Sequence, residues 1–383
     1  GLLYAGTEAV VYVSFDDGDR WQPLQLNLPM VPITDLRVHD NDLVAATQGR
    51  AFWILDGIAP LHEIDAVDES AGTHLFKPQD AYRLDSNSFQ QQQAKNPPDG
   101  AVFYYNRGEE LDGADGGLTL EVLDSNGSVI RRFSNVAAKE DDGGFVKGVI
   151  GEPPSPALDT NKGMNRYIWN LRTERYTEVS DTIRYVSTRP YRVAPGTYQA
   201  RLTLNGRSIT KSFEVIPDPR RDEISAQAWN HQQELLAELG AMVNDVHSAT
   251  NHMRSVVADV KKIIVDTSSM RNQVDELRTP GQALIEKINA WEVHVPQPEL
   301  PNNVQDLIAF PSRLLSTQIL HVMRAIDQDP PVTAGSELRT QELRDQWSGL
   351  VADMLQILDN DLREFNDLLG KYEIPAINSD PVE

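Results

Sequence analysis

Hydrophobic positions change their spacing twice along the chain, so the sequence divides into three regions. Residues 1–62 contain short runs of β-branched and aromatic residues bounded by Gly, Asp or Asn, which is the pattern of short strands. Residues 74–218 contain longer runs in which apolar and polar residues alternate, as in sheets with one buried face. Residues 222–372 repeat apolar residues at helical spacing. The pattern predicts a multidomain β plus α protein.

The strands expected in the first region are short and closely spaced. A gap of only a few turn-forming residues separates each from the next, which favours antiparallel sheets of consecutive strands. They are expected at Leu2–Ala5, Val10–Val13, Trp21–Leu24, Ile33–Val38, Leu43–Ala46 and Ala51–Leu55.

Two strong hairpin signals mark the second region. Asn126-Gly127 lies between the alternating runs 118–123 and 129–133, and Asn205-Gly206 lies between the runs 197–204 and 208–215. Asn-Gly favours the tight turn that joins antiparallel strands. With Tyr167–Leu171 as a further strand between them, the region is expected to be an antiparallel β-sandwich of immunoglobulin-like or fibronectin-like type.

The third region is expected to be an up-down, antiparallel helical bundle. One long apolar stripe runs from Trp229 to Ile264 and another from Leu343 to Leu368, with two shorter stripes between them. Proline-containing segments at 279–281, 295–298 and 329–331 are expected to break the chain between helices. Because both long stripes need cover, we expect the first and last helices to pack together.

A motif in the first region carries a family resemblance. Ser14, Asp16, Gly18 and Trp21 fit the pattern Ser-x-Asp-x-Gly-x-x-Trp, which resembles the Asp box of sialidase-type and sortilin-type β-propellers, also called BNR repeats. The resemblance implies that Asp16 accepts backbone N–H groups in a turn, that Gly18 supplies a positive φ, and that Trp21 is buried between blades. Residues 1–62 would then be terminal propeller blades, with a closing segment at Thr47–Asp56.

Other segments extend this resemblance into the second region. Leu75–Pro78, Asn96–Ala101, Gly163–Arg172 and Ala194–Tyr198 resemble a family of large exported bacterial proteins in which a BNR propeller precedes a sandwich and a helical tail. The resemblance implies an exported protein, periplasmic or extracellular, whose propeller is of the glycosyl-hydrolase-like or sortilin-like kind. It also implies that further propeller blades upstream are partners of residues 1–62.

Composition narrows the range of partners. The 383 residues carry a formal net charge of −22, which argues against nucleic acid or an anionic membrane surface as a partner. No apolar run approaches the length of a membrane span. The chain has no cysteine, which excludes disulfides, thiol catalysis and thiolate metal sites.

Chemical motifs are sparse, and we expect no catalytic residue, metal or cofactor. Asp16, Asp17 and Asp19 lie close together, but the Asp box uses its aspartate for the turn. His247 and His252 are five residues apart, which misses the zinc-helix spacing, and they are expected to be solvated or at the edge of the bundle. Four aromatic residues are candidates for stacking on sugar rings: Tyr104, Tyr105, Trp169 and Tyr176.

The sequence therefore favours a non-catalytic scaffold or interaction region of an exported propeller protein, with a glycan or protein ligand. Two alternatives stay open: an accessory part of a glycoside hydrolase whose active site lies in other blades, and a sortilin-like propeller that binds peptides or proteins. The strands of residues 1–62 should pack against the rest of the chain, or pair with another copy through exposed sheet edges.

Overall fold

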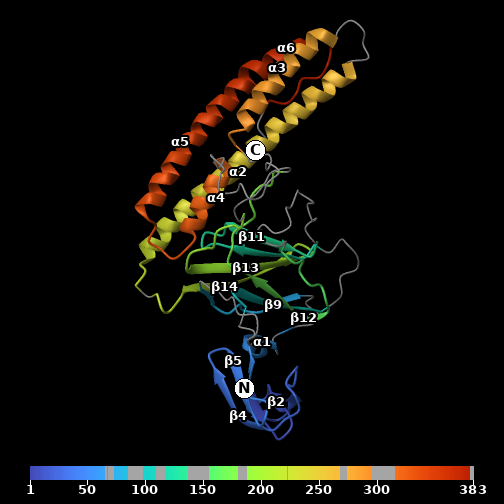
Figure 1. Ribbon diagram of the computed structural model, residues 1–383. Coiled ribbons are helices and arrows are strands. Elements are labelled where there is room, and N and C mark those ends of the chain that lie inside the picture. Colours follow the sequence, from blue (N-terminus) through green and yellow to red (C-terminus); the bar gives the residue numbers. More distant parts are fainter. Residues whose placement is uncertain are drawn as a thin grey trace. The chain divides into compact units, whose positions relative to one another are not determined.

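The chain is a mixed β plus α protein, as the hydrophobic pattern predicts (Figure 1). The computed structural model describes residues 1–64, 67, 73–84, 98–108, 117–136, 155–179, 188–221, 223–267, 274–295 and 315–379. The chain forms two compact units. Unit 1 comprises Gly1–Ala138, Ser155–Glu174 and Val193–Asp222, and unit 2 comprises Lys139–Pro154, Arg175–Arg192 and Glu223–Glu383. The predicted division into 1–62, 74–218 and 222–372 stays a prediction.

Two small antiparallel sheets open unit 1 and confirm the strands predicted there. One has the order β1 (Leu3–Gly6), β2 (Val11–Ser14), β3 (Gln22–Pro23), and the other has the order β4 (Ile33–His39), β5 (Asp42–Thr47), β6 (Phe52–Leu55). Val11, Leu43 and Ile58 form the buried centre between them. The short helix α1 (Ala59–Glu63) follows.

Two further sheets make up the rest of unit 1. One has five strands in the order β11 (Val129–Ser134), β10 (Thr119–Leu123), β13 (Gly196–Leu204), β14 (Arg207–Pro217), β8 (Ala81–Arg83). The other has the order β12 (Gly163–Trp169), β9 (Ala101–Arg107), β7 (Thr73–Leu75). Both predicted hairpins are confirmed. Asn205 and Gly206 take φ values of 50° and 77°, as a tight hairpin requires.

One strand pairing departs from the expected antiparallel arrangement. β8 lies parallel to β14, so the five-stranded sheet is mixed. After β7 in the three-stranded sheet the chain passes to the edge of the five-stranded one, where Asp80 Oδ1 accepts the backbone N–H of Glu214 at 3.0 Å. This side-chain bond precedes the ladder and holds a strand too short to carry a recognisable alternation.

An aromatic core joins the five-stranded and three-stranded sheets. The rings of Phe103 and Phe213, from different sheets, lie 5.5 Å apart, and Trp169 lies 6.2 Å from Tyr198. The four side chains are at most 8% exposed and belong to one hydrophobic cluster. Their edge-to-face contacts are the favoured geometry of aromatic pairs.

A buried carboxylate links three strands of the five-stranded sheet. Glu121 on β10 accepts hydrogen bonds from Arg132 on β11 at 2.9 Å and from Arg201 on β13 at 2.7 Å. Burial raises the pKa of Glu121, but the hydrogen bonds from Arg201 and Arg132 outweigh it, so that its pKa is lowered overall. The carboxylate is thus stabilised in its charged form.

Unit 2 is built from helices, with an extended segment along them (Figure 1). The helices are α2 (Ala226–Thr267), α3 (Val274–Glu292), α4 (Leu315–Ile326), α5 (Ala334–Gln356), the π-helical turn η4 (Ile357–Leu362) and α6 (Arg363–Lys371). Their apolar faces meet in one hydrophobic cluster. No helix in the described part of the chain is both long and apolar enough to cross a membrane.

The expected break at 279–281 is wrong. α3 begins at Val274 and contains Pro280, so one helix spans the proline. The next residue explains why: a Cβ built on Gly281 lies 2.9 Å from Ile264 Cδ1 and 3.1 Å from Val260 Cγ1 of α2. The close approach of α3 to α2 at this glycine stabilises the helix despite the proline. Of the other breaks, 329–331 lies between α4 and α5 as predicted, and 296–298 lies outside the described residues.

Contacts between the long first and last helices are less direct than expected. The backbone of α2 lies closest to α3 and α4, and both long apolar stripes reach the same cluster through these intervening helices. Side-chain pairs join α2 to α5 directly, because Arg344 donates to Glu238 Oε1 at 2.7 Å and His231 lies 2.7 Å from Glu337. The apolar faces of α2 and α5 are therefore buried largely against the shorter helices α3 and α4.

Substituting Gly281 tests the close approach of α3 to α2. Gly281→Ala should destabilise the chain by about 1 to 3 kcal/mol, because the added methyl overlaps Ile264, Val260 and Phe365. Gly349→Ala on α5 is the matched control. A Cβ there meets nothing within 4 Å, so the helix preference of alanine should stabilise by about 0.5 to 1 kcal/mol. Urea unfolding monitored by circular dichroism measures both, and equal effects would contradict the packing.

The Glu121 network predicts a pH dependence. A carboxyl group with a lowered pKa stabilises the fold above its unfolded pKa, and this contribution is lost as the pH falls through the folded pKa. We expect Glu121→Gln to cost about 1 to 2 kcal/mol at pH 7, since the buried acceptor loses its charge while water screens its two guanidinium partners, of which Arg132 is 63% exposed and Arg201 33%. The gap between wild type and variant should close below about pH 4. Chemical denaturation across pH 3 to 7 checks this, and a gap independent of pH would contradict it.

Candidate functional site

The residues of the Asp-box pattern form a hydrogen-bonded turn between β2 and β3. Ser14 Oγ donates to Asp16 Oδ1 at 2.9 Å and accepts the backbone N–H of Gly18 at 2.9 Å. Asp16 Oδ1 also accepts the backbone N–H of Arg20 at 2.8 Å, and this bond lowers the pKa of Asp16. Gly18 has a φ of 99°, which suits glycine. The expected bonds of Asp16 to backbone N–H groups are therefore present.

Trp21 does not behave as the motif predicts. Its side chain is 42% exposed, so the expectation that it is largely buried is wrong. The turn itself needs only bonds among neighbouring residues, whereas burial of the indole needs a second sheet against its face. Within the described residues the cluster of this part of unit 1 does not include Trp21.

We expect Asp16→Ala to reduce the hydrogen-exchange protection of the backbone amides in β1 to β3. The variant leaves the N–H of Arg20 and the hydroxyl of Ser14, which is fully buried, without their acceptor. Asp19→Ala is the matched control, because Asp19 is an exposed neighbour that contributes only its backbone N–H to the turn. Hydrogen exchange of β1 to β3 measures the effect, and equal protection in the two variants would contradict the role of Asp16.

Three of the four aromatic candidates for sugar stacking are buried in the fold. Tyr105 and Trp169 are fully buried and Tyr176 is 9% exposed. Tyr105 Oη donates to the carbonyl of Asp159 at 2.7 Å, and Trp169 Nε1 donates to the carbonyl of Arg172 at 2.8 Å. Burial is the main cause that raises the pKa of the Tyr105 hydroxyl. Their ring faces are therefore not available to a ligand.

Tyr104, the fourth candidate, lies in a group of ionisable residues on the other face of the same strand. It is half-buried and stands opposite Arg166 in the ladder of β9 and β12. Its hydroxyl lies 3.4 Å from the position of a Cβ on Gly57, and the N–H of Gly57 donates to Asp42 Oδ1 at 2.9 Å. Asp56 immediately precedes Gly57, so that the group consists of Tyr104, Arg166, Asp42 and Asp56.

The members of this group shift one another's pKa values. Burial raises the pKa of Asp56, the charge of Asp42 raises it further, and Arg166 opposes both. Burial is also the first cause that raises the pKa of Tyr104. A carboxyl group with a raised pKa beside a second carboxyl group is an arrangement that acid–base catalysis uses, and it is equally common in structural clusters. We take this group as the candidate functional site.

The extended residues 175–179 of unit 2 lie along α2, held by a row of polar side chains. Asn244 Oδ1 accepts the backbone N–H of Thr177 at 2.8 Å, and His247 Nδ1 lies 2.5 Å from the Thr177 carbonyl. One turn further on, Asn251 Nδ2 donates to the carbonyl of Glu178 at 2.8 Å. The three side chains share one face of α2, and they satisfy backbone N–H and C=O groups of the extended segment.

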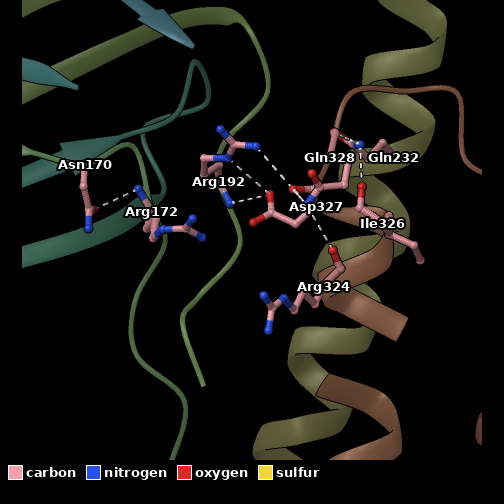
Figure 2. A network of polar contacts seen from close by, with 8 residues as sticks. All are labelled: Asn170, Arg172, Arg192, Gln232, Arg324, Ile326, Asp327 and Gln328. Atoms are coloured by element: carbon pink, nitrogen blue, oxygen red, sulfur yellow. Dashed lines mark hydrogen bonds and ion pairs between the residues drawn. The ribbon is translucent and has the colours of Figure 1, made fainter. Parts of the chain in front are cut away.

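Residues 190–192 are held against α4 in the same unit (Figure 2). The backbone N–H of Arg192 donates to Asp327 Oδ1 at 3.1 Å, and its guanidinium donates to the Asp327 carbonyl at 3.3 Å. Nearby, Gln232 of α2 donates to the carbonyls of Ile326 and Gln328. Tyr191 and Tyr176 both lie against Gly240 of α2, where a Cβ would come within 3.4 Å of each ring.

His247 and His252 of α2 are buried, so the expectation that they are solvated is wrong. His247 is 9% exposed and His252 is 7% exposed. His247 Nδ1 faces a carbonyl, which can only accept, so this nitrogen carries a proton. Its Nε2 lies 2.6 Å from Ser316 Oγ of α4. The side chain therefore fastens a loop and a second helix to α2.

Sequence reasoning missed most of the candidate site. Asp42 belongs to no motif, and Asp56 and Arg166 lie in segments that carry only the family resemblance. They meet Tyr104 because two sheets of unit 1 bring them together. The one available signal was the position of Asp56 and Asp42 at the ends of adjacent strands. Within the described residues, no group of three or more His, Asp or Glu side chains is arranged to hold a metal ion.

Comparison with known proteins adds no assignment. No family model, no curated protein and no solved structure matches this chain. The fold and the local contacts are therefore the basis of any functional proposal.

Proposed function

We propose that this chain is a non-catalytic scaffold and interaction region of an exported protein. It would combine the end of a BNR-type propeller in residues 1–62, an immunoglobulin-like sandwich and an antiparallel helical bundle. The observation that carries the proposal is the Ser14–Asp16–Gly18 turn, whose hydrogen bonds are those that an Asp box requires. The Asp16 carboxylate therefore contributes to the structure of the turn.

The distribution of exposed apolar residues supports an interaction role. Large hydrophobic side chains are strongly exposed in the first sheets of unit 1, which is unusual for a surface that meets only water. The members of this set are Leu3, Trp21, Leu26, Met30, Val38, Phe52 and Ile54, with exposed fractions from 41% to 77%. Such a surface fits a module that packs against further sheets or a protein ligand.

One observation favours a second candidate function, a glycoside hydrolase site within this chain, which differs from the accessory role whose active site lies in other blades. Asp42 and Asp56 lie near each other, and Asp56 has a raised pKa, as the acid of a glycosidase pair requires. Arg166 and Tyr104 would then contact a sugar hydroxyl. Under the scaffold proposal, this group has a structural role and joins the segment at Gly57 to the sheet of β12, β9 and β7.

Turnover of aryl glycosides separates the two. The scaffold proposal expects the wild-type chain and the Asp42→Asn, Asp56→Asn double variant to release no more aryl alcohol than buffer does. The hydrolase alternative expects release that the double variant abolishes and that declines as the pH rises through the raised pKa of Asp56, since the acid must be protonated. Turnover with this pH profile would overturn the scaffold proposal.

A further inference from the structure

Strand β6 forms an edge of its sheet in the described part of the chain. The sheet order is β4-β5-β6, so only one side of β6 pairs with a neighbour. Thr47 donates its backbone N–H to the Ala51 carbonyl at 3.1 Å, and hydrogen-bonded pairs recur at every second residue of an antiparallel ladder. Trp53 and Leu55 therefore bond to β5. The backbone groups of Phe52 and Ile54 point to the open edge.

The side chains beside this edge are apolar. Phe52 is 75% exposed and Ile54 is 58% exposed, on the face of the sheet that also carries Val44 and Ala46 of β5. An open strand edge next to an apolar face readily pairs with another strand, and proteins that do not use such an edge protect it with charges, prolines or bulges. β6 itself has none of these.

The charges that flank β6 favour one direction of pairing. Arg50 precedes the strand and Asp56 follows it, and both are exposed. If two copies of β6 lie antiparallel, the Arg50 end of each meets the Asp56 end of the other, which gives two attractive pairs. A parallel arrangement would place like charges together. Within its own chain, Asp56 is repelled by Asp42 and attracted by Arg166. Arg50 of the second copy would add another attractive charge beside Asp56.

The geometry of the ladder also fixes the register. In an antiparallel pair, two residues that both point their backbone groups at the shared edge can exchange both N–H···O bonds. Phe52 of one copy would therefore lie opposite Ile54 of the other, and the twofold axis would pass through Trp53. This register sets an aromatic side chain against a β-branched one on each side of the axis, a favourable cross-strand pair. It also brings Arg50 and Asp56 to matching ends.

We propose that this chain forms a twofold dimer in which β6 pairs antiparallel with β6 of a second copy, with Trp53 on the axis. The two three-stranded sheets then form one continuous sheet with an apolar outer face. The inference rests on the interaction role proposed above, and names the partner as a second copy. Because the shared strand is short, we expect a dissociation constant on the order of micromolar.

Sedimentation equilibrium of the whole chain at about 0.15 M salt tests the dimer, since at that ionic strength the repulsion between two acidic chains is largely screened. We expect a concentration-dependent mass between monomer and dimer. Arg50→Asp alone and Asp56→Arg alone should each weaken the dimer by about tenfold or more, because both exchange attractive pairs for repulsive ones. Circular dichroism confirms that each variant is folded.

Mixing the two single variants gives the decisive result. In an equimolar mixture, both charge pairs across the axis are attractive again, so a heterodimer should form with about wild-type affinity. The double variant R50D/D56R should likewise dimerise with itself. Another register, or pairing through a different surface, predicts no recovery in either case.

A second variant tests the backbone pairing. Ile54→Pro removes an N–H that faces the open edge and leaves the bonds to β5 intact, so it should abolish the dimer without unfolding the sheet. A wild-type chain that stays monomeric up to about 100 µM, or variants that dimerise like wild type, would overturn the inference. A peptide that occupies the edge of a monomeric chain would also overturn it. These outcomes concern mass alone, so they are independent of the turnover result that tests the proposed function.

Discussion

The need to cover apolar surface governs both units, and one aromatic core shows how far it is met in unit 1. Trp169 is fully buried between two sheets, with Tyr198 and Phe213 at its edges. Its indole N–H donates to a backbone carbonyl, so the largest side chain of the core leaves no polar atom unsatisfied. The sheets around this core can keep a fixed register because a shift of one residue would turn these rings to water.

Unit 2 also buries its apolar surface in one core, but its polar side chains are satisfied differently. A single cluster collects the apolar faces of α2 to α6, and several polar side chains of α2 bond to backbone groups of other segments. Asn244, His247 and Asn251 hold an extended segment, and Gln232 holds the end of α4. Polar side chains that bind backbone in this way fix how segments run along a helix, which apolar contacts alone would leave variable.

Local patterns predicted the elements better than they predicted the contacts between them. The Asn-Gly hairpins and the strands of residues 1–62 follow from turn chemistry and alternation within a few residues. The parallel β8 and the helix through Pro280 do not, because each depends on a partner distant in sequence: Glu214 for β8, and Val260 and Ile264 for α3. The candidate site was not predicted for the same reason, since Asp42, Asp56 and Arg166 come together only in the folded unit.

The turn of Ser14, Asp16 and Gly18 shows both kinds of contact, those within a few residues and those between distant segments. Its hydrogen bonds link residues at most four positions apart, so the sequence determines them almost completely. The burial of Trp21 requires another sheet against the turn, and the side chain is 42% exposed. The motif is therefore reliable as a statement about a turn and weaker as one about a propeller. A partner of this part of unit 1 would be expected to bind where apolar side chains such as Trp21, Phe52 and Ile54 stay exposed after folding.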